Sequence, residues 1–181
     1  MVGRGHIPND PGRKERILDA TVAVIAELGT DGTTHRRIAE RASVPMGSLT
    51  YYFSGLDDIL EQAFLRFAEQ ASKQFQELMN AAADRDQAVE AIADLICGAE
   101  GVQHNLPVVW SMYLFADRSE ATALVARNWL RQSRAGLRLH FAESRCLVID
   151  ALIEGWLIHA RFEPSRPERE TVVAAVRILA E

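Results

Sequence analysis

The chain has 181 residues, of which 48% are hydrophobic and 25% are charged, and its formal net charge is −5. This composition excludes a disordered chain and is sufficient for one large or two small folded domains. Because no apolar run reaches the roughly 18 residues of a membrane-spanning helix, and residues 1–10 lack the hydrophobic stretch of a signal peptide, we expect a cytoplasmic protein.

The acidic charge lies in the second part of the chain. Residues 1–53 contain seven Arg or Lys and six Asp or Glu, whereas residues 54–181 contain 13 and 19. The whole-chain charge is therefore a poor test of DNA binding, because phosphate affinity depends on a local basic face. The residues that could form such a face are Arg36 and Arg37, with Arg13, Lys14 and Arg16 as possible helpers.

Apolar residues recur at helical spacing along the whole chain, and no convincing strand alternation is present, so we expect an all-α fold. The first helix should start near Asp10, a candidate capping residue, with Pro11 at its first position. It should run to Leu28 and stop at Gly29. This helix would cover the two short helices that follow.

Two short helical patterns lie on either side of residues 42–44. In the first pattern, Thr33 or Thr34 is expected to cap the helix start by accepting a hydrogen bond from a backbone N–H. The second pattern begins at Pro45, and its apolar residues Leu49 and Phe53 lie four positions apart. Two short helices joined by a tight turn form a helix-turn-helix, whose second helix enters the DNA major groove.

Ten residues of this motif are candidates for DNA contact. Those at the start of the first helix are expected to hold phosphate, and those of the second helix to face the groove and the flanking backbone. Tyr51 and Tyr52 could equally be core aromatics, although the hydroxyl of Tyr52 favours a phosphate contact. The candidates are Thr34, His35, Arg36, Arg37, Pro45, Met46, Ser48, Thr50, Tyr51 and Tyr52.

The run T-x-x-x-I-A-x-x-A-x-V-x-x-G-x-L-x-Y-Y-F, which starts at Thr34, resembles the TetR family of bacterial one-component regulators. The longer string from Thr34 to Leu60 is more similar to the subgroup that contains the enterobacterial regulator RcdA. The resemblance covers about residues 13–60. It implies a DNA-binding transcriptional regulator, typically a repressor, that releases DNA when a small effector occupies its C-terminal domain.

Three positions depart from the family pattern. Ser43 stands where the family usually has Gly in the turn, and a non-Gly residue with positive φ costs about 1 kcal/mol. Thr50 replaces a frequent Tyr, and Leu56 replaces a frequent Lys that contacts phosphate. The register of the motif is unaffected by these three changes.

A much longer helical pattern begins near Leu56, with Ser54 and Asp57 as a capping-box-like start, and continues for about 25 residues. So long a helix must leave the small DNA-binding head and enter whatever follows. We therefore expect a DNA-binding domain at residues 1–55 and a helical ligand-binding and dimerisation domain at residues 56–181.

The last two helical patterns, from Leu147 to Phe162 and from Glu168 to Leu179, are apolar over more than a narrow stripe. Such wide apolar coverage suggests a face that is left for a partner. The TetR resemblance implies a homodimer in which these two helices pair with their copies. A fully intramolecular core is the alternative.

Large apolar side chains between the long helix and the dimer helices suggest a pocket for a small, largely apolar effector. A ligand beside the second half of the long helix would tilt it and move the DNA-binding residues. The alternative is a ligand-independent scaffold or nucleoid-associated protein, for which the interior should be solid. The candidate lining residues are Phe67, Phe75, Trp110, Tyr113 and Trp129, and the candidate orienting groups are His104, Asn105, Tyr113 and Asn128.

No P-loop, dinucleotide-binding, HExxH, GxSxG or CxxC spacing is present in the sequence. We therefore expect no enzyme, no catalytic residue, no metal site and no cofactor. Asp150 and Glu154 form a carboxylate pair four residues apart on one helix. Such a pair without a cleft is interpreted as a surface or interface feature.

Overall fold

The computed structural model describes residues 10–98, 100–163, 165 and 167–181, without the side chains of residues 100–105, 160 and 161. Within these residues the chain forms nine α-helices and no strand, which confirms the all-α fold. The helices are α1 (Arg13–Leu28), α2 (His35–Ala42), α3 (Met46–Tyr52), α4 (Leu56–Ala81), α5 (Arg85–Cys97), α6 (Glu100–Ala116), α7 (Glu120–Leu137), α8 (Glu143–Phe162) and α9 (Arg169–Ala180).

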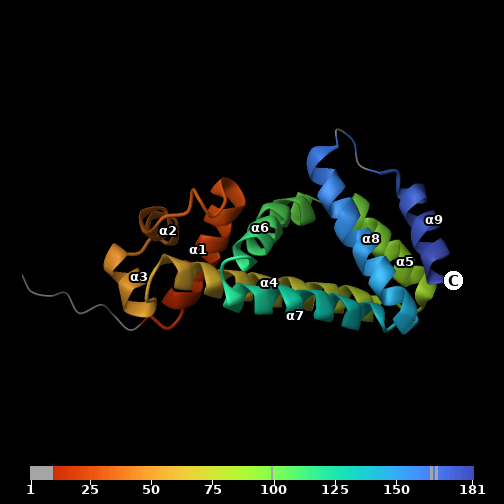
Figure 1. Ribbon diagram of the computed structural model, residues 1–181, viewed down its shortest axis with the longest axis horizontal. Helices are drawn as coiled ribbons and strands as arrows, with labels where there is room; N and C mark the ends of the chain where they lie inside the picture. The colour runs from red at the N-terminus through yellow and green to blue at the C-terminus, as the bar shows by residue number, and fades with distance from the viewer. Residues whose placement is uncertain (1–9, 99, 164, 166) are drawn as a thin grey trace, which may run out of the picture.

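The long helix α4 connects the two ends of the molecule (Figure 1). Helices α1, α2 and α3 pack around its first turns at one end, and α5, α8 and α9 pack together at the other. Helix α7 runs beside α4 along most of its length, and α6 lies between α1 and α8. Any change in the tilt of α4 therefore acts on both ends.

Three hydrophobic clusters follow one another along α4. The first holds α1–α3 together and includes Ile59 and Ala63 of α4. The second joins α1, α4, α6 and α7 around the fully buried Phe64. The third packs the end of α4, including Met79, against α5, α8 and α9. Because one helix contributes to all three clusters, its apolar face is the common support of the fold.

The helix ends show where local signals act. Gly29 ends α1 with a positive φ of 67°, as expected. The expected cap at Asp10 is wrong, because α1 begins later, at Arg13, and the Asp10 carboxylate instead accepts the backbone N–H of Gly12. The carboxylate also pairs with Arg16 at 2.5 Å.

The start of α4 differs from the expected capping box in one residue. The backbone N–H and the hydroxyl of Ser54 both donate to Asp58, at 2.8 and 3.1 Å, so Asp58 takes the place expected for Asp57. These bonds, with a third from Gln62, hold the pKa of Asp58 below its usual value. Among the helices described, none combines the length and the apolarity that crossing a bilayer requires.

Candidate DNA-binding surface and effector cavity

Helices α2 and α3 form the helix-turn-helix at one end of the molecule. Thr34 caps α2, since its hydroxyl oxygen accepts the backbone N–H of Arg37 at 3.3 Å. The other candidate cap, Thr33, is buried, and its hydroxyl donates to the carbonyl of Gly29 at 2.7 Å. The two neighbouring threonines therefore stabilise the turn before α2 in different ways: Thr34 caps the helix, and Thr33 binds the end of α1.

Ser43 makes the turn between α2 and α3 in the left-handed conformation, with φ 54° and ψ 47°. Its N–H reaches the carbonyl of Glu40, and the N–H of Val44 reaches the carbonyl of Ala39 at 3.0 Å. This is the hydrogen-bond pattern of a glycine-type helix end, made here with a serine. The departure from the family pattern at Ser43 therefore leaves the turn geometry intact.

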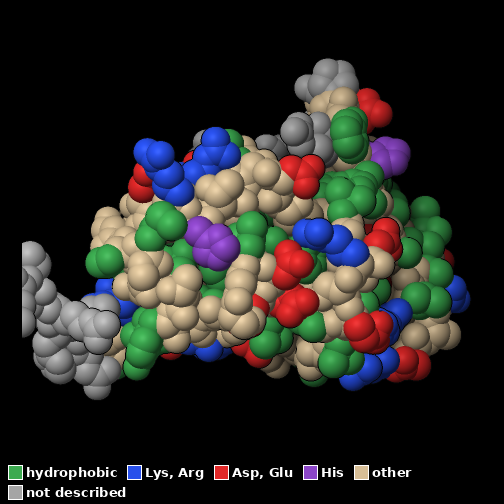
Figure 2. All heavy atoms as spheres, turned by 60° about the vertical axis from the view of Figure 1, so that its left-hand side comes forward, with side chains coloured by type: hydrophobic (Ala, Val, Ile, Leu, Met, Phe, Trp, Pro, Cys, Tyr) green, Lys and Arg blue, Asp and Glu red, His purple; other side chains and the backbone are tan. Residues whose placement is uncertain are grey.

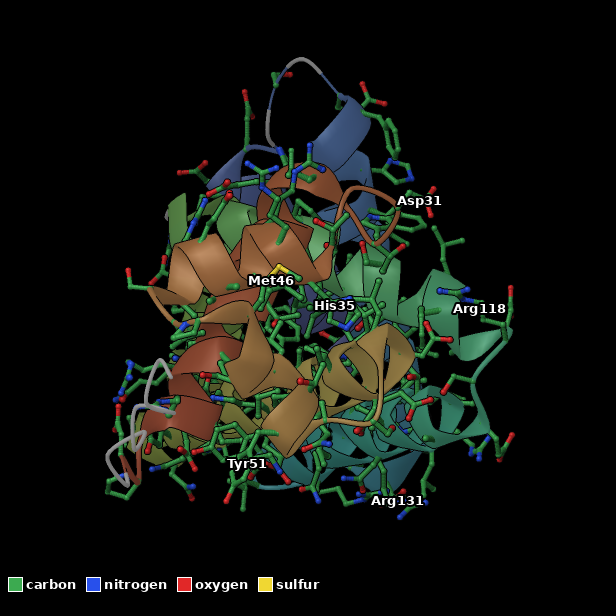
Figure 3. All side chains as sticks on the ribbon, turned by 90° about the vertical axis from the view of Figure 1, so that its left-hand side faces the viewer. Asp31, His35, Met46, Tyr51, Arg118 and Arg131 are labelled. Atoms are coloured by element: carbon green, nitrogen blue, oxygen red, sulfur yellow. The ribbon has the colours of Figure 1, made fainter. Side chains whose placement is uncertain are left out.

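The outer side of α3 presents side chains of several kinds to solvent. Met46 is 57% exposed and Tyr51 is 78% exposed, and Thr50 is exposed between them in sequence. Figure 3 shows Met46, Tyr51 and His35 on the same end of the molecule. A thioether and two hydroxyl groups at the outer face of a short helix can contact base edges and phosphates.

Ser48 does not belong to this exposed surface. It is only 1% exposed, and its hydroxyl has no hydrogen-bond partner among the described residues. The buried face of α3 is wider than the sequence pattern indicated, because Ser48 and Leu49 are both covered and Tyr52 and Phe53 continue this face one turn later. The prediction that Ser48 faces the groove does not fit this conformation.

The two adjacent tyrosines have different surroundings. The ring of Tyr52 is half-buried against the first hydrophobic cluster, and the rings of Tyr51 and Tyr52 form a T-shaped pair at a centroid distance of 4.8 Å and an angle of 90°. Tyr51 is therefore the tyrosine that projects outward, and Tyr52 supports it from the core side.

The candidate phosphate-binding cations already have partners within the chain. Arg36 pairs with Glu40 at 2.8 Å, and the guanidinium of Arg37 donates to the carbonyl of Gly32. Lys14 lies 5.6 Å from the ring centre of Phe53. Exposed pairs of this kind contribute about 0–1 kcal/mol each, so a phosphate can replace such a partner at small cost.

A cavity of about 310 Å³ lies in the C-terminal half, at the lower end of the range for ligand sites. The rings of Phe67 on α4 and Trp129 on α7 stack along one wall at a centroid distance of 5.9 Å. The remaining described lining is mostly aliphatic and aromatic. The lining residues are Phe67, Ala71, Ser72, Gln74, Phe75, Leu78, Leu95, Leu106, Val109, Trp129, Ser133, Ile153, Glu154 and Leu157.

Three of the five candidate ligand residues, Phe67, Phe75 and Trp129, meet in this cavity. Tyr113 reaches it only through a hydrogen bond to a lining residue, and Trp110 is not among the described lining residues. Asn128 lines a separate depression of about 820 Å³ along α4 and α7, together with charged side chains of both helices. The side chains of His104 and Asn105 lie outside the described residues.

Glu154, which the sequence pattern indicated only as half of a surface or interface pair, lines the cavity. Its two carboxylate oxygens accept the indole N–H of Trp129 at 3.1 Å and the hydroxyl of Tyr113 at 3.2 Å. Burial raises the pKa of Glu154 despite these two bonds, and it also raises the pKa of Tyr113. Nothing in the local sequence reveals this role, because the helix is apolar on several sides.

Asp150, one turn before Glu154, is also buried and accepts the hydroxyl of Ser133 at 2.5 Å. Burial raises the pKa of Asp150 as well. The interpretation of Asp150 and Glu154 as a surface or interface pair is therefore wrong. Both carboxylates face the interior of the C-terminal half.

Known proteins share this architecture. The sequence model of "Bacterial regulatory proteins, tetR family" matches residues 17–63, which contain the helix-turn-helix. SCO7518 from Streptomyces coelicolor A3(2) is 40% identical in sequence to this chain. Its crystal structure superposes with a TM-score of 0.83, and the match covers 94% of this chain and 99% of SCO7518. The chain belongs to the TetR family. It is thus a helix-turn-helix transcriptional regulator and not an enzyme.

Two further TetR-fold relatives extend the comparison. The HTH-type transcriptional regulator PksA of Bacillus subtilis (strain 168) is 21% identical over 172 residues, which are 88% of this chain and 84% of PksA. The multidrug binding protein EbrR, solved in complex with ethidium, is 25% identical, covers 93% of this chain and 99% of its own, and gives a TM-score of 0.74. The similarity to the RcdA subgroup stays a prediction.

Proposed function

We propose that the protein is a transcriptional repressor that binds an inverted-repeat operator as a homodimer and is released by a small, largely apolar effector. The cavity in the C-terminal half carries this proposal. A lined apolar cavity is what ligand control requires, whereas a ligand-independent scaffold or nucleoid-associated protein would need only a solid interior.

The DNA contacts in this proposal come from α2 and α3. Thr34, Arg36 and Arg37 hold phosphate at the start of α2, with His35 and Pro45 at the edges of the contact, and Tyr52 contributes its hydroxyl at most to the flanking backbone. The exposed side chains of α3 read the groove. These reading side chains are Met46, Thr50 and Tyr51.

The dimer contact comes from α8 and α9. Hydrophobic side chains gather on the end of the molecule that these helices form, among scattered charged groups (Figure 2). Such large exposed apolar groups favour burial against a second copy. A two-fold dimer presents two copies of α3, and so it matches two half-sites related by the same symmetry. The exposed apolar residues are Leu147, Val148, Phe162 and Ile178.

Helix α4 provides the mechanical coupling in this proposal. Its first turns hold Ile59 and Ala63 in the core of the DNA-binding end, and its later turns hold Phe67 and Phe75 in the cavity wall. An effector that pushes on the cavity wall tilts α4 and changes the distance between the two copies of α3. A preference of a few kcal/mol for the tilted state is enough to release DNA.

The same proposal places the division between the DNA-binding and the effector domains at residues 55 and 56, and it places the protein in the cytoplasm. The first turns of α4 remain attached to the DNA-binding end, as their packing with α1–α3 requires. A fragment of residues 1–55 alone should therefore not fold, because it lacks Ile59 and Ala63, and limited proteolysis should release a stable DNA-binding fragment that extends past Ala63.

The test is an unbiased selection of duplexes bound by the purified protein, repeated with a metabolite extract present. The proposal expects an enriched inverted repeat whose half-sites lie about one helical turn or more apart on one DNA face. The extract should lower the yield of that sequence. Enrichment of no sequence, or of a single half-site alone, would contradict the proposal.

A further inference from the structure

The described cavity wall contains one ionisable side chain among uncharged ones. Among its described lining residues only Glu154 is ionisable, and it projects from α8 beside Trp129 of α7. The walls from α4 and α5 contribute uncharged side chains only. Burying a carboxylate in such surroundings costs several kcal/mol unless it is paired, so its presence needs a reason.

The hydrogen bonds to Glu154 do not by themselves supply that reason. Each carboxylate oxygen accepts one hydrogen bond, from Trp129 and from Tyr113 respectively, and a carboxylate has about four acceptor sites. Two sites therefore remain for a ligand. Orienting an indole and a phenol requires only a neutral acceptor, such as an amide oxygen, and no negative charge.

No salt bridge joins Glu154 to a Lys, Arg or His within the described side chains. The ionisable groups that act on it are Asp150 on the same helix and Tyr113 on α6, and neither supplies a positive charge. Arg134 on α7 acts on Asp150 instead. When Glu154 is ionised, no positive side chain therefore offsets its charge within the described part of the cavity wall.

The aromatic wall adjoins this charge. Trp129 both donates to Glu154 and lines the cavity, with Phe67 stacked on it at an interplanar angle of 13°. A positive group beside the carboxylate would thus lie next to aromatic rings, whose faces attract cations. The apolar remainder of the ligand would fill the aliphatic part of the cavity.

We propose that the cavity takes an amphiphilic organic cation, a protonated or quaternary amine on an aromatic or aliphatic body, and that Glu154 binds its positive group. This inference rests on the proposed function only for the consequence of binding, which is the release of DNA. It assigns the chemical class of the effector and the residue that selects it.

The test uses two fluorescent probes of the same shape. One is the cation 4-(4-dimethylaminostyryl)-N-methylpyridinium, and the other is its uncharged analogue 4-dimethylamino-4′-methylstilbene. Binding of each to the full-length protein without DNA is measured by fluorescence titration. The wild type should bind the cation at least about tenfold more tightly than the neutral analogue, a ratio that reports the contribution of charge.

Three variants locate the source of that ratio. Glu154→Gln keeps the size and an acceptor oxygen but removes the charge, so the ratio should fall to about one. Tyr113→Phe removes one hydrogen bond but keeps the charge, and Glu77→Gln removes a charge from the exposed side of α4, so both should retain the ratio. Circular dichroism confirms that each variant is folded.

The pH dependence gives a second signature. A cation binds the ionised carboxylate, so its affinity for the wild type should rise with pH as Glu154 loses its proton, whereas the affinity of the neutral analogue should stay constant. Equal binding of the two probes, an unchanged ratio in Glu154→Gln, or no binding of the cation would each overturn the inference.

Addition of DNA separates this inference from the proposed function. If the cation binds through Glu154 but leaves the selected operator bound, the ligand class stands and effector control is wrong. If a neutral compound from the metabolite extract releases DNA equally from the wild type and from Glu154→Gln, effector control stands and the ligand class is wrong.

Discussion

The indole N–H of Trp129 donates a 3.1 Å hydrogen bond to the carboxylate of Glu154, so that an aromatic ring of α7 holds a buried acid of α8. Both residues line the cavity, and the ring of Phe67 covers Trp129 from the side of α4. Side chains of three helices thus meet at one ionisable group, whose pKa is raised by burial.

Replacing Glu154 by Gln should remove the contribution of this carboxyl group to the pH dependence of folding stability. The folded-state pKa of Glu154 is raised by burial, so the folded protein binds its proton more tightly than the unfolded chain. The contribution of Glu154 to the stability of the wild type is therefore lost as pH rises from the unfolded value of 4.5 through the folded pKa. Urea denaturation between pH 4.5 and 8 should show that the free energy of unfolding of Glu154→Gln increases relative to that of the wild type as pH rises.

The control for this experiment is Glu77→Gln, whose carboxylate is exposed on α4 and pairs with Lys73. Its stability relative to the wild type should change little over the same range, because exposed pairs contribute little. A stability difference between Glu154→Gln and the wild type that is constant with pH, or that shifts in favour of the wild type as pH rises, would contradict the assignment of a raised pKa.

Ser43 offers a test of backbone strain in the helix-turn-helix. Its left-handed conformation is unfavourable for a residue with a side chain and free of strain for glycine. Ser43→Gly should raise the free energy of unfolding by about 0.5–1 kcal/mol, after allowance for the greater freedom of glycine in the unfolded chain.

A valine at the same exposed position should have the opposite effect. Its branched side chain disfavours positive φ, so Ser43→Val should lower the free energy of unfolding by about 1 kcal/mol or more. Chemical denaturation measures both variants. Equal stability of the glycine and valine variants would show that the turn differs from the one described.

Ser48 and Thr50 lie on the same short helix, α3, but Ser48 is buried and Thr50 is exposed, so variants at the two positions test which face of the helix contacts DNA. The hydroxyl of Ser48 is buried and has no hydrogen-bond partner in the described part of the chain, so Ser48→Ala should leave the protein equally stable or up to about 1 kcal/mol more stable. It should leave the preferred DNA sequence unchanged. Thr50→Ala, at an exposed position, should change the preferred sequence with little effect on stability.

Duplex selection with both variants is the measurement. A shift of the preferred sequence in Ser48→Ala, with no shift in Thr50→Ala, would show that α3 contacts DNA with the other face.

The exposed apolar residues of α8 and α9 predict the oligomeric state. Ile178 is 69% exposed and Leu147 is also exposed, so a glutamate at either position should leave the fold intact but place a charge in the dimer contact. Sedimentation equilibrium at micromolar concentration should show a dimer for the wild type and a monomer for Ile178→Glu and Leu147→Glu.

Leu124→Glu is the matched control, because Leu124 is a comparably exposed leucine on α7. This variant should remain a dimer. A monomeric wild type would contradict the dimer and, with it, the inverted repeat.

The sequence was sufficient to predict the parts of the fold that local signals determine. Periodic apolar residues marked the helices, Gly29 marked the end of α1, and Thr34 marked the start of α2. Tertiary packing decided the rest. Ser48 is covered because the buried face of α3 is wider than its apolar residues alone indicate, and no local pattern reveals that width.

The cavity residues also differ in whether the sequence could predict them. Aromatic composition indicated Phe67, Phe75 and Trp129, because large side chains are common in ligand sites. The position of Glu154 depends on how α8 is rotated against α6 and α7, which a single sequence does not state. A carboxylate on an apolar helix could therefore be interpreted as a surface group until its partners were known.

The most direct test of effector control is to fill the cavity. Ala71 lines it from α4, and Ala71→Phe would occupy the ligand volume without altering α2 or α3. Operator affinity, measured by fluorescence anisotropy with and without the metabolite extract, should fall at least about tenfold on addition of extract to the wild type. Ala71→Phe should bind the operator as well as the wild type and remain bound when extract is added. Release of both proteins to the same extent, or of neither, would contradict the claim that a ligand in this cavity controls DNA binding.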